Sequence, residues 1–66
     1  MDTKELVAVL ARKWNMDDDL FAGPECLERM GRYVSEMTEQ DMSSDELADL
    51  YKKVKKRYQE LRAFRM

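Results

Sequence analysis

Cys26 is the side chain of this sequence best suited to nucleophilic or redox chemistry, but it has no catalytic partner. It falls in the first turn of an expected helix, where a helix dipole can favour a reactive thiolate. The sequence contains no histidine, the commonest general acid or base near neutral pH and a frequent metal ligand. A CxxC partner is missing as well. We therefore expect Cys26 to be a small, half-buried apolar residue.

Three consecutive aspartates invite comparison with the calcium-binding EF-hand loop. If Asp17 is the first position of such a loop, the third and twelfth positions are Asp19 and Glu28, which fit. The fifth and sixth positions are Phe21 and Ala22, where the loop requires an oxygen ligand and a glycine. We therefore interpret the aspartates as a solvated connector. With no phosphate loop, zinc spacing or catalytic triad either, we expect no metal site, no cofactor and no enzyme activity.

Charge is distributed unevenly along the chain. Residues 1–50 carry thirteen acidic and five basic side chains, whereas residues 51–66 carry seven basic side chains and one acidic one. The overall net charge of −2 conceals this separation. On a helical wheel the lysines of the basic segment lie opposite its apolar stripe or beside it, where their alkyl stems can cover the core.

One interpretation of the basic segment is internal neutralisation. If the last two helices are antiparallel, the basic end of the third lies near the start of the second. The acidic side chains in that region are Asp17, Asp18, Asp19, Glu25 and Glu28. Cations near a helix C-terminus and anions near a helix N-terminus also suit the helix dipoles.

A second interpretation, compatible with the first, is a docking surface for another protein. Aromatic residues and methionine are enriched in interface cores, and charge selects the partner. The candidate partner-binding residues are Tyr51, Tyr58, Phe64, Lys52, Lys53, Lys56 and Arg57, with Met66 as a further apolar anchor.

A third interpretation is binding of nucleic acid through lysine–phosphate contacts. The acidic isoelectric point of about 5.1 and the lack of a known recognition module weigh against it. Nucleic-acid binding by the basic segment is the alternative to protein binding.

Helix signals recur through the sequence, and no strand signal is present. Asp2-x-x-Glu5 and Ser43-x-x-Glu46 have the spacing of capping boxes, and Pro24 suits the first position of a helix. We also expect Asn15 to end the first helix in a left-handed conformation. The predicted helices cover about residues 3–14, 24–39 and 44–64. The apolar positions of the third helix alternate in steps of four and three, which predicts packing at a shallow angle.

The length of 66 residues allows one domain, residues 1–66, with a small core. Self-association is a common remedy for a small core, so the expected partner is another protein or a second copy. A single cysteine argues for a reducing compartment, and the chain has no signal-peptide pattern or bilayer-spanning stretch. We expect no membrane partner and a cytoplasmic location.

Together these patterns predict an all-α fold, a small three-helix bundle with antiparallel neighbours. The predicted function is a non-enzymatic protein-interaction module that acts as an adaptor, regulator or accessory subunit.

Overall fold

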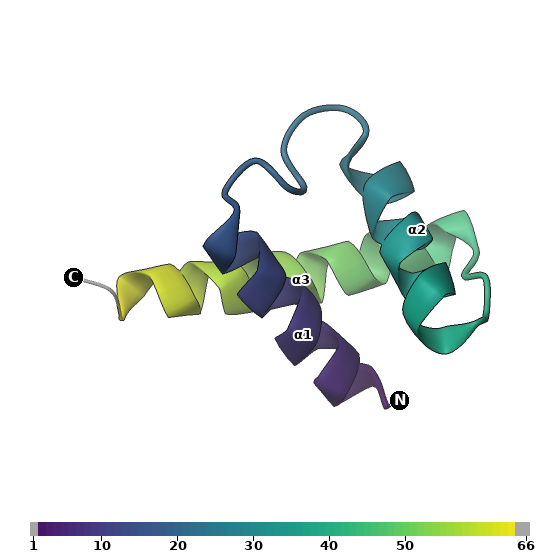
Figure 1. The fold of residues 1–66 in the computed structure, drawn as a ribbon, viewed down its shortest axis with the longest axis horizontal. Coiled ribbons are helices and arrows are strands. Elements are labelled where there is room, and N and C mark those ends of the chain that lie inside the picture. Colours follow the sequence, from purple (N-terminus) through teal and green to yellow (C-terminus); the bar gives the residue numbers. More distant parts are fainter. Residues whose placement is uncertain (1, 65–66) are drawn as a thin grey trace.

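The computed structural model describes residues 2–64, which form three helices and no strand. Helix α1 covers Thr3–Met16, α2 covers Cys26–Thr38 and α3 covers Ser44–Ala63 (Figure 1). The prediction of a small all-α three-helix bundle is confirmed. Met66 lies outside the described residues. None of the helices in residues 2–64 is long and apolar enough to cross a membrane.

The helix starts show which local signals determine the ends of elements. The carboxylate of Asp2 accepts a hydrogen bond from the backbone N–H of Lys4 at 2.6 Å, so it caps α1. At α3 both halves of the capping box are present, because Ser43 and Glu46 each bond the backbone N–H of the other. These bonds satisfy N–H groups that have no partner within the helix.

Two predicted helix ends are wrong. Pro24 is not the first residue of α2. It lies in a turn after Gly23, whose φ is 86°, and Glu25, with φ −96° and ψ 14°, is the N-cap of the helix that begins at Cys26. Asn15 is not a left-handed cap either. Helix α1 continues through it to Met16, and Asp17 then leaves the helix in an extended conformation.

The buried residues of α1 and α3 are spaced by four, which sets how the helices cross. The ridge of α1 is Leu6, Leu10 and Trp14, and the ridge of α3 is Leu50, Val54 and Tyr58. Ridges of this spacing pack at about 50° to one another. Figure 1 shows α1 crossing α3 obliquely, which differs from the shallow packing that the alternating spacing predicts. Consequently other apolar positions of the four-and-three pattern of α3, which we call the seam, are only half-buried: Leu47, Tyr51 and Leu61.

Helix α3 is the platform on which the other two helices pack. Both α1 and α2 contact α3, but they contact each other sparsely. Figure 1 shows α1 and α2 running in opposite senses, with α3 passing behind them. Residues 17–25, between α1 and α2, form the connector. Its Phe21 fills the space between the helices, is 1 % exposed and meets the Trp14 ring edge-on at 5.5 Å.

Candidate protein-interaction face

The basic residues of α3 form an exposed ridge. Because the apolar side of the helix is held in the core, the opposite side faces solvent. We call Lys52, Lys53, Lys55 and Lys56 the lysine ridge. All four are exposed, and none of them forms an ion pair within the described residues. Arg57, the fifth member of the basic run, pairs with Glu60 of its own helix at 3.2 Å.

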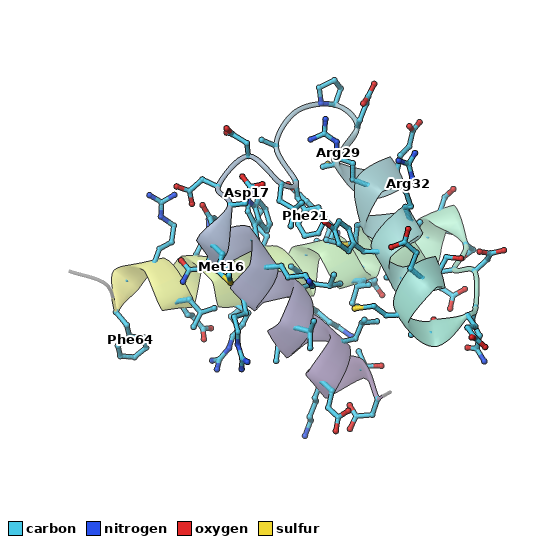
Figure 2. All side chains as sticks on the ribbon, in the orientation of Figure 1. Met16, Asp17, Phe21, Arg29, Arg32 and Phe64 are labelled. Atoms are coloured by element: carbon cyan, nitrogen blue, oxygen red, sulfur yellow. The ribbon has the colours of Figure 1, made fainter. Side chains whose placement is uncertain are left out.

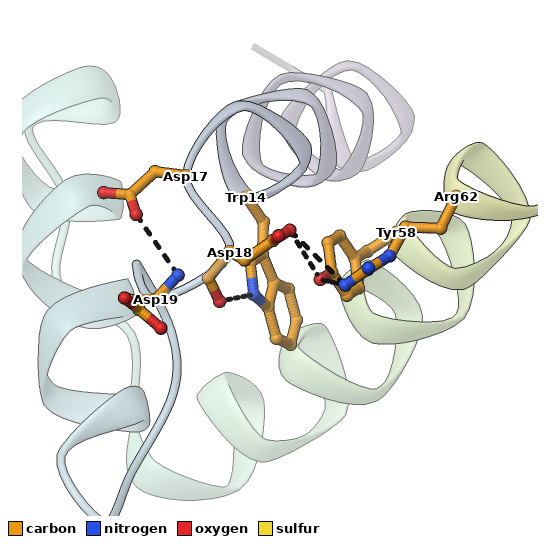
Figure 3. Close-up of polar contacts among 6 residues, drawn as sticks. All are labelled: Trp14, Asp17, Asp18, Asp19, Tyr58 and Arg62. Carbon is orange, nitrogen blue, oxygen red and sulfur yellow. Dashed lines mark hydrogen bonds and ion pairs between the residues drawn. The ribbon is translucent and has the colours of Figure 1, made fainter. Parts of the chain in front are cut away.

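Internal neutralisation does occur further along α3, at Arg62. The carboxylate of Asp18 lies 3.4 Å from the guanidinium of Arg62 and accepts a hydrogen bond from the Tyr58 hydroxyl at 3.0 Å (Figure 3). Arg62 also donates to that hydroxyl at 2.6 Å, and the Trp14 indole donates to the Asp18 carbonyl at 3.1 Å. We call these four residues the aspartate clasp. The clasp joins the connector to α3 but leaves the lysine ridge unpaired.

The clasp also affects the acidity of Arg62. The hydrogen bond to Tyr58 raises the pKa of the guanidinium, and the nearby Asp18 carboxylate raises it further.

Tyr58 is not a free anchor for a partner, contrary to the sequence prediction. Its side chain is 9 % exposed, and its ring stacks on Trp14 at 4.2 Å with an angle of 7° between the rings. The ring and the hydroxyl of Tyr58 are therefore both in contact with other residues of the same chain. The seam pattern placed Tyr58 on the apolar side of α3, but it did not reveal that α1 covers this position.

The other two aromatic candidates differ in exposure. Tyr51 is half-buried, with its ring 5.8 Å from that of Trp14. Its burial raises the pKa of its hydroxyl, and the neighbouring Cys26 adds to this effect. Phe64 is 86 % exposed, and Figure 2 shows it at the C-terminal end of α3, pointing away from the helices. Of the three, only Phe64 presents its ring to solvent.

The structure adds residues that sequence reasoning missed, because they lie on α1. Lys4, Val7 and Ala8 line a groove together with Lys53 and Arg57 of α3. The sequence signal was faint: Lys4 and Ala8 are four residues apart, beside the apolar stripe of α1. Nothing in the sequence says that this side of α1 meets the basic side of α3.

A second groove, between the connector and α2, is less suited to binding a partner. It has a volume of about 470 Å³, and its lining mixes both signs of charge. The guanidinium of Arg29, labelled in Figure 2, donates to the backbone oxygens of Asp19 and Leu20 at 3.4 Å. The guanidinium of Arg29 thus already has hydrogen-bond acceptors within the chain.

The remaining candidates for chemistry are Cys26 and the aspartates between α1 and α2. Cys26 is half-buried, as predicted. The carboxylate of Asp17 accepts a hydrogen bond from the backbone N–H of Asp19 at 3.2 Å, which tightens the connector. Within residues 2–64, no group of three or more Cys, Asp or Glu side chains could hold a metal ion.

Comparisons with protein-family models, with curated proteins and with solved structures found no match to this chain.

Proposed function

We propose that this protein is a non-enzymatic interaction module that binds an acidic protein partner through the lysine ridge of α3. The observation that carries the proposal is the exposure of four adjacent lysines that lack an ion pair in the described part of the chain. They stand on a helix whose opposite side is fixed by Leu50 and Val54, which are 2 % and 0 % exposed. The ridge is thus a cluster of like charges on a fixed helix, which favours fast and selective encounter with an acidic surface.

Nucleic acid is the second candidate, and the charges around the ridge favour it less. Asp45 and Asp49 precede Lys52 and Lys56 by seven residues each, so they share the same side of α3. A phosphate backbone extended along this helix would meet those carboxylates and be repelled. A protein partner can instead place single acidic side chains opposite single lysines. We include a cytoplasmic location in the proposal, because the chain has one cysteine and no pair for a disulfide.

Affinity capture with a charge-reversed ridge tests the proposal. The immobilised protein is compared with Lys52→Glu/Lys56→Glu, and captured proteins are identified at low and moderate salt. The matched control is Arg12→Glu/Arg32→Glu, which makes the same change of net charge at exposed positions of α1 and α2. We expect a partner that the ridge variant loses and the control keeps. Capture that survives ridge reversal would contradict the proposal.

A parallel titration addresses the second candidate. Fluorescent duplex DNA and single-stranded RNA are titrated with the wild-type protein and with the same two variants. Affinity that falls steeply with salt and is lost only in the ridge variant would assign the ridge to nucleic acid.

A further inference from the structure

The groove between α1 and α3 borders the lysine ridge and shares Lys53 with it. It has a volume of about 550 Å³ and is lined by Thr3, Lys4, Val7, Ala8, Lys53 and Arg57. Val7 and Ala8 are half-buried and form its apolar floor. Among the residues that the structure describes, no residue of α2 or of the connector lines it. Helix α2 therefore does not cover this flank of the α1–α3 pair.

The rim of this groove carries charge of one sign. Lys4 rises from α1, Lys53 and Arg57 rise from α3, and no carboxylate lines the groove within residues 2–64. The pair of Arg57 with Glu60 does not block this rim, because both side chains are about half exposed, at 52 % and 47 %. Exposed ion pairs contribute about 1 kcal/mol or less, so a ligand carboxylate can replace Glu60.

Phe64 extends the same side of α3. It follows Lys53 by eleven residues and Arg57 by seven, spacings that keep side chains on one side of a helix. The distance from Lys53 to Phe64 along the helix is about 16 Å, at 1.5 Å per residue. A ligand about three turns long would thus meet the groove at one end and an exposed aromatic ring at the other.

We infer that the α1–α3 groove binds an acidic amphipathic helix of the partner. This inference rests on the proposed function and specifies the class of ligand. Apolar side chains of the ligand would pack on Val7 and Ala8, where the small Ala8 side chain permits close approach. Its carboxylates would pair with Lys4, Lys53 and Arg57.

The structural elements that border the groove favour a helical ligand over an extended peptide. Two helices flank it, and residues 2–64 contain no strand edge to which an extended peptide could add. An amphipathic helix laid into an apolar groove is the established alternative mode of peptide recognition. Nucleic acid would satisfy the cationic rim but would leave the apolar floor without a partner. The combination of apolar floor and basic rim therefore favours an acidic amphipathic helix.

Selection from a displayed library of random peptides of about 15 residues, roughly four helical turns, tests this inference on the full chain. We expect enrichment of peptides that combine Asp or Glu with apolar residues at spacings of three and four. The enriched peptides should gain helical circular dichroism on binding. Enrichment of peptides without this pattern would overturn the inference.

A substitution that fills the groove locates the binding site. We expect Ala8→Phe to weaken binding of the selected peptides by about tenfold or more, equivalent to about 1.4 kcal/mol. The matched control is Ala22→Phe, at an exposed position of the connector, and we expect it to bind as the wild type does. Because the larger side chain in α1 can disturb folding, Lys53→Glu/Arg57→Glu serves as a second variant, with the fold of each checked by thermal unfolding. Peptide binding that survives both groove variants would overturn the inference.

The two proposals fail in different ways. If reversal of Lys52 and Lys56 abolishes capture of the protein partner but Ala8→Phe leaves it intact, the ridge binds the partner and the groove does not. If neither variant affects capture, both proposals fail. If sedimentation equilibrium shows a dimer that Ala8→Phe converts to a monomer, the groove belongs to a self-association interface and the inference is overturned.

Discussion

Tyr58 links the core and the connector through one side chain. Its ring stacks on Trp14, and its hydroxyl stands between the Asp18 carboxylate and the Arg62 guanidinium. The charged partners remain about half exposed, at 55 % and 53 %, so water screens much of their attraction. We attribute most of the contribution of Tyr58 to the buried ring and a smaller part to the hydroxyl.

Removing only the hydroxyl separates these two contributions. We expect Tyr58→Phe to lower the free energy of unfolding by about 1 kcal/mol, the usual net value of a protein hydrogen bond. Urea denaturation followed by circular dichroism measures the change. The control is Tyr33→Phe, because Tyr33 is half-buried and its hydroxyl makes no hydrogen bond within residues 2–64. Equal effects of the two substitutions would show that the clasp does not contribute to stability.

Tyr51 should make stability depend on pH in alkaline solution. Burial, with a smaller effect of Cys26, raises the pKa of Tyr51 above its ordinary value of 10.0. Above pH 10.0 the folded chain therefore holds this proton while the unfolded chain loses it, so the free energy of unfolding falls as pH rises. We expect Tyr51→Phe to make this decline shallower, measured by urea denaturation at pH 7 and above pH 10.0. A difference between variant and wild type that is the same at both pH values would refute the assignment.

At the scale of elements, the start of α3 is fixed by its capping box. Ser43 accepts a hydrogen bond from the backbone N–H of Glu46 at 3.3 Å, and the Glu46 carboxylate accepts one from the backbone N–H of Ser43 at 3.2 Å. The helix that begins here is the platform for both other helices. Loss of the cap should therefore affect the whole fold.

Ser43→Ala tests the contribution of this cap. We expect it to lower the free energy of unfolding by about 1 kcal/mol, the typical cost of losing an N-cap side chain. Thermal unfolding by circular dichroism measures it. The neighbouring Ser44→Ala is a close control, because Ser44 is exposed and its hydroxyl makes no hydrogen bond in the described part of the chain. If Ser44→Ala costs as much as Ser43→Ala, the capping box is not the cause.

The elements also show what the sequence could and could not predict. The caps at Asp2 and Ser43 were predictable, because both depend on residues no more than three positions apart. The start of α2 was not, because the positive φ of Gly23 belongs to a turn that competes with the helix signal of Pro24. The α1–α3 groove could not be predicted, because it depends on which sides of two helices far apart in the sequence meet in the folded chain.

At the scale of the whole molecule, the central part of the apolar side of α3 is covered within one chain. Leu50, Val54 and Tyr58 are covered by the chain itself and leave 2 %, 0 % and 9 % of their surface exposed. The large apolar side chains that remain exposed in residues 2–64 are Met16 and Phe64, at 81 % and 86 %. They lie at the C-terminal ends of two different helices. Within residues 2–64, a second copy would therefore meet half-buried rather than fully exposed apolar side chains along α3.

Molecular mass in solution tests this closure. We expect a monomer of about 7.9 kDa across a concentration series in sedimentation equilibrium, at low and at moderate salt. The physical reason is that Leu50, Val54 and Tyr58 are already covered within the chain and the lysine ridges of two copies repel each other. A dimer would contradict this, and Phe64→Ala would then locate its interface. If that substitution restores the monomer, a second copy occupies the basic side of α3, and the acidic partner proposed for the α1–α3 groove must be replaced by the protein itself.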